Sequence, residues 1–119
     1  MNRRGFGTDG EYAVSDFLTG QGYRVTDMHY RRGPGEIDVI ARQGETVVFV
    51  EVKRRTDARF GAPAEAVDGL KRSRIARTAL LYLQQKGLMD APVRFDIVEL
   101  TPGQIRHIPN AFDASDVFS

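Results

Sequence analysis

The chain has 119 residues, of which 41% are hydrophobic and 28% are charged, and this composition is typical of a soluble globular protein. This length supports one hydrophobic core, so we expect a single domain over residues 1–119, with residues 1–8 and 113–119 as loose ends. No apolar run approaches the roughly 20 residues that cross a bilayer, and the start MNRRGFGTDG lacks the apolar segment of a signal peptide. The chain has no cysteine, which excludes disulfides and thiolate metal sites. We therefore expect a cytoplasmic protein without a membrane partner.

The net charge of +1 conceals an uneven distribution of basic residues. Residues 52–86 contain nine basic and three acidic side chains, whereas residues 90–119 contain five acidic side chains and two arginines. Fourteen of the 17 basic residues are arginine, whose planar guanidinium suits phosphate. The pattern favours a face that binds a polyanion, and the alternative is a solvated basic surface.

The first elements in chain order are a short helix and a strand. Thr8 or Asp9 is a candidate helix cap, and the apolar spacing predicts a helix over residues 10–18 that ends at Gly20-Gln21-Gly22. Residues 23–30 alternate well enough for a strand, and residues 31–35 then read as a turn. Arg31 and Arg32 of that turn are candidates for phosphate contact, although solvated turn charges explain them equally well.

The middle of the chain, residues 35–55, reads as a hairpin of two strands with a turn at Gln43-Gly44-Glu45. Strict alternation predicts that Ile37, Val39 and Ala41 share one face of the first strand, and that Asp38 shares the other face with Glu36 and Ile40. In the second strand, Glu51 and Lys53 share a face with Val47 and Phe49.

A second helix is predicted over residues 64–86, with Ile75, Ala76, Ala79, Leu80 and Leu83 in its buried stripe. Arg74 and Arg77 point away from that stripe, and Lys71 lies at its margin. With Arg54 and Arg55 these side chains form a basic ridge that either contacts phosphate or is solvated.

The last part of the chain reads as a strand over residues 93–100 and a short hairpin partner over residues 105–108, with a turn at Thr101-Pro102-Gly103-Gln104. The tail is expected to dock through Phe112 and Phe118. The element order α-β-β-β-α-β(-β) predicts an α/β sandwich around a mixed sheet whose second and third strands form the central hairpin.

Three charged residues, Asp38, Glu51 and Lys53, are predicted to converge at one end of this hairpin. Burying them costs several kcal/mol unless they pair or bind an ion. Two carboxylates and the carbonyl of Val52 form an oxygen site suited to Mg²⁺ or Mn²⁺, which bridges phosphate oxygens. Lys53 could position or deprotonate a water, so a phosphodiester is the natural substrate. A purely structural ion pair of Glu51 with Lys53 is the alternative, but it leaves Asp38 unexplained.

Glu11 and Glu36 are the other acidic candidates. Glu11 lies in the first turn of the predicted helix, where a carboxylate either interacts with the helix N-terminus or is aimed at the site. Glu36 is assigned mainly to structure, as a partner of the neighbouring turn or a base in the surroundings of the site.

The spacing of D…E-x-K resembles the PD-(D/E)XK nuclease superfamily. More closely, G-x-x-G-E-x-x-A-x-x-F-L, GEIDVIA, VVFVEVKRR, AVDGLKRSRI, RFDIVEL and H-I-x-N-A-F resemble the bacterial YraN-like family (UPF0102), related in fold to archaeal Holliday-junction resolvases. The likeness extends from about residue 7 to residue 112. It implies a restriction-endonuclease-like three-layer fold, Asp38, Glu51 and Lys53 as catalytic residues, and Glu11 as a further acidic member at the metal.

This resemblance implies a Mg²⁺- or Mn²⁺-dependent endonuclease that acts on DNA, including branched DNA, and DNA is favoured over RNA. A junction substrate suits a homodimer, because two-fold symmetry presents two sites to two strands. The alternative function is a nucleic-acid-binding module that retains the site without turnover or needs a partner for it. Under either function the basic candidates contact the phosphate backbone; they are Arg31, Arg32, Arg54, Arg55, Lys71, Arg74 and Arg77.

Overall fold

The computed structural model of the chain describes residues 9–55 and 69–114. Two helices and five strands follow each other in the order α-β-β-β-α-β-β. Their bounds are α1 Asp9–Gly20, β1 Arg24–Arg32, β2 Gly35–Gln43, β3 Thr46–Arg54, α2 Gly69–Lys86, β4 Val93–Thr101 and β5 Gln104–Ile108. The order confirms the predicted element sequence.

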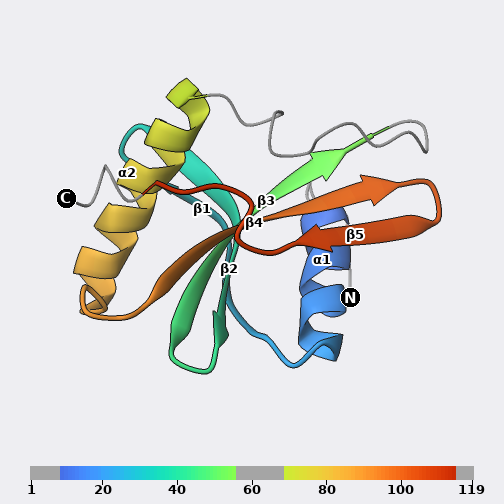
Figure 1. The fold of residues 1–119 in the computed structure, drawn as a ribbon, viewed down its shortest axis with the longest axis horizontal. Coiled ribbons are helices and arrows are strands. Elements are labelled where there is room, and N and C mark those ends of the chain that lie inside the picture. The colour runs from blue at the N-terminus through green and yellow to red at the C-terminus, as the bar shows by residue number, and fades with distance from the viewer. Residues whose placement is uncertain (1–8, 56–68, 115–119) are drawn as a thin grey trace.

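The five strands form one mixed sheet in the order β1-β2-β3-β4-β5. Strands β1, β2 and β3 are joined antiparallel by tight turns, and β4 and β5 form a second antiparallel hairpin. The three-stranded unit and the β4–β5 hairpin meet where β3 pairs parallel with β4, with Lys53 opposite Glu99. A parallel pair needs a crossover, and α2 lies in that connection (Figure 1).

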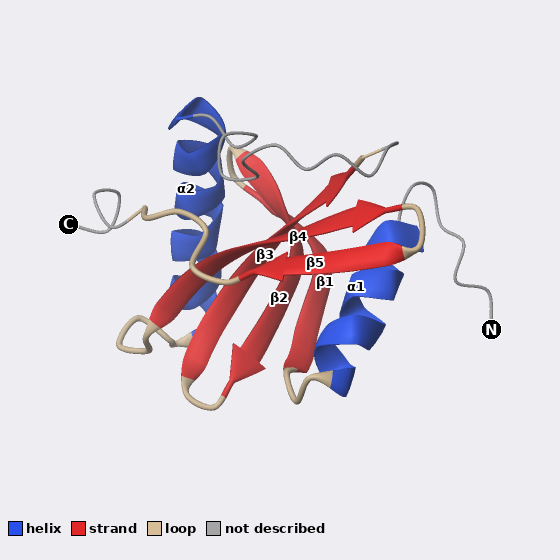
Figure 2. Ribbon diagram, turned by 45° about the vertical axis from the view of Figure 1, so that its right-hand side comes forward, coloured by secondary structure: helices blue, strands red, loops and turns tan. Residues whose placement is uncertain are grey.

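The two helices cover opposite faces of the sheet, which gives the predicted three-layer α/β sandwich (Figure 2). Helix α2 packs on one face against a core that contains Ile40, Phe49 and Phe95. Helix α1 packs on the other face against Val39, Val48 and other β-branched side chains. The central strands are covered on both faces, and their side chains are therefore largely apolar on both sides of the sheet. No helix in the described ranges is long and apolar enough to span a bilayer.

Most element bounds agree with the expectation, and the exceptions concern the ends. Arg31 and Arg32 belong to β1 and not to a turn, because the connection to β2 contains only Gly33 and Pro34. Gly33 has a φ of 61°, which glycine adopts without strain. The predicted start of the second helix, residues 64–68, lies outside the described residues.

The described end of the chain packs onto the α2 side of the core. Phe112 stacks on Phe95 with ring centroids 5.2 Å apart, as the predicted docking of the tail requires. Ala114 is only 3% exposed, so the expected loose end at residues 113–119 does not apply to this position. Phe118 lies outside the described residues.

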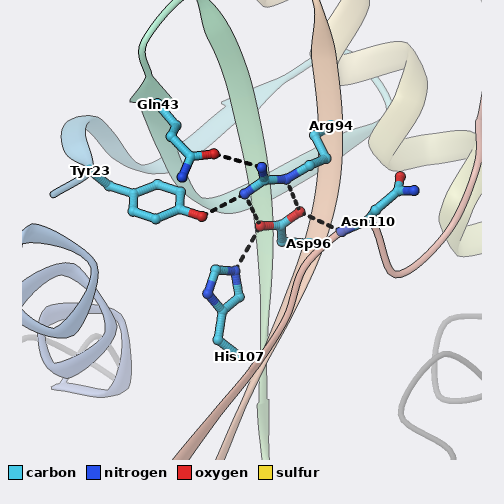
Figure 3. Close-up of polar contacts among 6 residues, drawn as sticks. All are labelled: Tyr23, Gln43, Arg94, Asp96, His107 and Asn110. Atoms are coloured by element: carbon cyan, nitrogen blue, oxygen red, sulfur yellow. Dashed lines mark hydrogen bonds and ion pairs between the residues drawn. The ribbon is translucent and has the colours of Figure 1, made fainter. Parts of the chain in front are cut away.

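A buried carboxylate, Asp96, joins β4, β5 and the tail on the α1 side of the sheet (Figure 3). Two nitrogens of Arg94 donate to the two oxygens of Asp96 at 2.9 and 2.8 Å, and His107 Nε2 lies 2.7 Å from Asp96 Oδ2. The backbone N–H of Asn110 donates to Asp96 Oδ1 at 2.9 Å. Burial alone would raise the pKa of Asp96, but the hydrogen bonds from His107, Arg94 and Asn110 outweigh it and lower that pKa.

Replacing Asp96 with alanine is expected to lower the free energy of unfolding by about 3–5 kcal/mol, because Arg94 would lose its buried counterion. Urea unfolding at pH 7 measures this loss. The matched control is Asp90→Ala, at an exposed position before β4, which should stay within about 0.5 kcal/mol of the wild type. Equal stability of the two variants would contradict the assigned role of Asp96.

Candidate active site

Asp38 lies at a break in the alternation of β2. Ile37 and Ile40 both belong to the core under α2, whereas Val39 belongs to the core under α1. The prediction that Ile37 and Val39 share a face was therefore wrong. On the neighbouring strand, His29 lies between the pairs Met28–Val39 and Tyr30–Ile37 and has a φ of 54°. This left-handed residue locally changes the twist of the hairpin, which strict alternation does not anticipate.

Asp38 meets β3 through a hydrogen bond to its backbone. The N–H of Val52 donates to Asp38 Oδ2 at 2.7 Å. Because the N–H and C=O of one strand residue point to the same side, the Val52 carbonyl also points toward β2. Glu51 is 7% exposed, and its carboxyl group lies within hydrogen-bonding reach of Asp38. The predicted approach of the two carboxyl groups is present.

The pKa of Asp38 is strongly affected by these surroundings. Burial raises it most, the charge of Glu51 raises it further, and the Val52 N–H only partly opposes them, so that the pKa reaches about 7. An aspartate in this state holds a proton near neutral pH when no metal is present. Such a raised pKa is typical of carboxyl groups at functional sites.

Two lysines face the carboxyl pair. Lys53 Nζ lies 3.6 Å from Glu51 Oε2, and Lys71 of α2 forms an ion pair with the same oxygen. Burial lowers the pKa of Lys53, and the neighbouring Lys71 lowers it further. Burial alone would lower the pKa of Lys71 as well, but its hydrogen bond with Glu51 and the charge of Glu51 outweigh burial and raise it. Lys53 is therefore the lysine that gives up its proton more readily.

Glu11 reaches the edge of this site from α1. Its charge contributes to the raised pKa of Asp38, and its buried Oε1 has no hydrogen-bond partner among the described residues. Within the described ranges, however, no three side chains of the kinds that bind metals are grouped closely enough to hold an ion together. Glu11 thus lies beside the Asp38–Glu51 pair and does not complete a triad of carboxylates.

The donor set fits a hard divalent cation. Mg²⁺ and Mn²⁺ prefer oxygen ligands and keep several waters, so two carboxylates and one carbonyl suffice on the protein side. The unpaired Oε1 of Glu11 could accept a hydrogen bond from such a water. The chain has two histidines, and the Nε2 atoms of both contact other residues, that of His29 at Arg31 and that of His107 at Asp96.

Several of the predicted phosphate contacts are already engaged within the protein. Arg55 Nε donates to the buried Glu99 at 2.7 Å, and Arg31 Nε donates to Glu36 at 2.9 Å. The contact of Glu36 with Arg31 agrees with its assignment to structure. Arg54 lies over the first turn of α1, where a Cβ on Gly10 would come within 2.6 Å of its guanidinium.

Arg32, Arg74 and Arg77 are exposed, as expected for a basic ridge. Arg74 lines a groove between the β1–β2 turn and the first turns of α2, and Arg32 lines a neighbouring hollow that shares Pro34, Gly35 and Glu36 with it. Thr78 fixes Arg32 to α2 by donating to its carbonyl at 2.8 Å. Lys71, the ion-pair partner of Glu51, also lines the groove.

Two contacts at and near the site are not predicted by the sequence. Lys71 is predicted at the margin of the buried stripe of the second helix, as a phosphate contact or a solvated charge, whereas in the structure it contacts Glu51. The buried Glu99 accepts a hydrogen bond from Arg55, and this pairing has no local sequence signal because 44 residues separate the two.

In metal-free protein, Asp38→Asn is expected to remove a pH dependence of stability. The pKa of Asp38 is about 7 in the folded state and near 3.8 when unfolded, so the native state binds more protons between these values. The free energy of unfolding must then fall as pH rises from about 4 to 7 and stay level above it. The variant should be more stable than the wild type at pH 8 by about 1–3 kcal/mol.

Urea unfolding at pH 5 and pH 8 in EDTA measures this difference. Asp90→Asn, at an exposed position, is the control and should keep the slope of the wild type. An unchanged slope in Asp38→Asn would show that the carboxyl group titrates in its ordinary range.

Comparison with known proteins assigns this sequence to a family. Residues 10–100 match the family described as Uncharacterised protein family UPF0102. A UPF0102 protein of Symbiobacterium thermophilum is 48% identical over 119 aligned residues, which cover 96% of this chain and 100% of the relative. A UPF0102 protein of Geobacter metallireducens is 38% identical, with 95% and 96% covered.

Among solved structures, the fold is similar to that of Hjc from Archaeoglobus fulgidus, a Holliday junction resolvase. The TM-score is 0.54 at 17% identity, with 87% of this chain and 71% of the resolvase covered. This likeness concerns the fold, and it confirms the expected resolvase-type architecture. The family match extends over more than half of the chain and includes Asp38, Glu51 and Lys53, and the chain therefore belongs to the UPF0102 family.

Proposed function

We propose that the protein is a metal-dependent nuclease that binds DNA, including branched DNA, and hydrolyses its phosphodiester bonds in the cytoplasm. The observation that carries this proposal is the convergence of the Asp38 and Glu51 carboxyl groups with Lys53, fixed by the hydrogen bond from Val52 to Asp38. Likeness in fold to a Holliday junction resolvase supports the choice of DNA as substrate.

Asp38, Glu51 and the Val52 carbonyl would hold Mg²⁺ or Mn²⁺, with Glu11 bonded to its water. The bound ion would neutralise negative charge that develops on the phosphate. The lowered pKa of Lys53 supports a role in which this lysine would take a proton from the attacking water. The water oxygen then bonds to phosphorus, the bond from phosphorus to the leaving oxygen breaks, and a phosphomonoester and a hydroxyl group result.

The groove beside α2 supplies a path for the sugar-phosphate backbone. Arg74 is exposed along it, Arg32 is exposed in the adjoining hollow, and Lys71 lines the groove and pairs with Glu51. Arg77 extends the same helix surface. Arg31, Arg54 and Arg55 would contribute charge near the path, although Arg31 and Arg55 each have an internal counterion. A homodimer would present two such sites to a branched substrate.

One observation favours a second candidate function, a nucleic-acid-binding module without turnover. The ion pair of Lys71 with Glu51 leaves a cation on the metal-binding oxygen of the isolated chain. A partner or a substrate would then be needed to open the site.

Lys53→Ala is expected to lower the rate of DNA cleavage by at least about 100-fold, because the proton acceptor for water is lost. Purified protein is incubated with Mg²⁺ or Mn²⁺ and with linear, supercoiled, flapped and four-way DNA, and the products are separated by electrophoresis. Lys86→Ala, at the other end of α2, is the matched control and should cleave like the wild type.

Cleavage that persists in Lys53→Ala and in Glu51→Gln would point to a contaminating nuclease and sink the proposal. Binding without cleavage for every substrate and metal would favour the module. If the protein shows no salt-sensitive binding at all, both functions fail, because phosphate contacts release counterions.

Arg32→Ala and Arg74→Ala are each expected to weaken DNA binding and to reduce the slope of log K against log salt by about one. Fluorescence anisotropy at several salt concentrations measures the slope. The control is Arg24→Ala, an exposed arginine at the opposite end of β1. If Arg24→Ala has the same effect as Arg32→Ala, the groove is not the preferred path.

A further inference from the structure

Lys71 reaches the site from α2, outside the central hairpin. It lies near the start of α2 and crosses to Glu51 Oε2 on β3. Its side chain is 42% exposed, compared with 8% for Glu51 and 22% for Lys53. The lysine thus has one end in the buried site and is partly open to solvent along its length.

Lys71 adds positive charge to the site when no metal is present. Two carboxyl groups, Asp38 and Glu51, face two amines, Lys53 and Lys71, and both amines approach the same Glu51 oxygen. A buried carboxylate is strongly destabilised without a cation beside it. In the metal-free chain, Lys71 is therefore one of the two cations that stabilise the ionised Glu51.

A divalent ion on the same carboxylates would place positive charges close together, so one amine has to leave. Lys53 is held on β3 and is the more buried of the two. Lys71 has more exposure and already lines the groove that contains Arg74. Its four-carbon chain can swing there without moving the backbone.

We propose that Lys71 is an internal countercation that occupies the metal-binding oxygen of Glu51 and moves into the phosphate groove when a divalent ion takes its place. This inference rests on the proposed function for the identity of the ion and of the groove's ligand. It assigns Lys71 two successive partners, first Glu51 and then a phosphate of the nucleic acid. Lys71 is thus a positioning residue that links metal loading to substrate binding.

The first test is calorimetric titration of Mn²⁺ into EDTA-stripped, dialysed full-length protein. Lys71→Met keeps the length of the side chain and removes its charge, so the affinity for Mn²⁺ should rise roughly tenfold. Lys86→Met, on the same helix but away from the carboxyl pair, should bind Mn²⁺ like the wild type. Circular dichroism verifies the fold of each variant, and Lys71→Gln replaces Lys71→Met if the latter does not fold.

Equal or weaker Mn²⁺ binding by the uncharged variants overturns the inference. If Asp38→Asn nevertheless lowers Mn²⁺ affinity, the metal site of the proposed function stands. If neither the wild type nor the Lys71 variants bind Mn²⁺, the inference and the proposed metal site fall together. The two failures are therefore distinguishable without any measurement of cleavage.

The second test concerns the move into the groove. Binding of a phosphorothioate duplex, which resists cleavage, is measured against salt with and without Mn²⁺. Without Mn²⁺, Lys71→Met and the wild type should have the same salt slope, because Glu51 holds the lysine. With Mn²⁺, the slope of the variant should be smaller by about one phosphate contact. Equal slopes under both conditions would overturn the proposed second partner.

Discussion

The buried contact of the Asp38 and Glu51 carboxyl groups is the constraint on which the rest of the site depends. Two acids within hydrogen-bonding reach cannot both be charged in a largely apolar sheet unless protons or cations compensate them. Three features compensate the negative charge of the pair: a raised pKa at Asp38, a backbone N–H from Val52 and two lysine side chains. The stability of the fold and the chemistry of the site are therefore determined by the same group of residues.

The architecture explains how so much charge can be tolerated there. The centre of the sheet is apolar on both faces, and α1 and α2 cover it from opposite sides. Glu11 approaches the Asp38–Glu51 pair from one of these helices and Lys71 from the other. A second buried carboxylate, Asp96, is fully hydrogen-bonded by Arg94, His107 and Asn110, which is the arrangement of a structural group.

These two carboxylate environments show why burial alone does not identify a functional acid. Asp96 has donors on both oxygens, so its pKa falls and its charge is fixed. Asp38 has one backbone donor and a like-charged neighbour, so its pKa rises and its charge depends on what binds. An acid such as Asp38, which is ionised only when a cation stabilises it, is suited to binding a metal ion. Asp96 has all its partners within the protein and holds the β4–β5 hairpin and the tail together.

The sequence by itself determined the element order, the central hairpin and the meeting of Asp38, Glu51 and Lys53, because these depend on local periodicity and on short turns. Only the tertiary structure decided that Lys71 pairs with Glu51, that Arg55 is held by Glu99 and that Glu11 lies beside the carboxyl pair. Contacts of this kind join residues that are distant in the chain, and they follow from how each helix packs on the sheet. The break in alternation at Asp38 lies opposite the left-handed His29 on the adjacent strand, and no pattern within β2 predicts it.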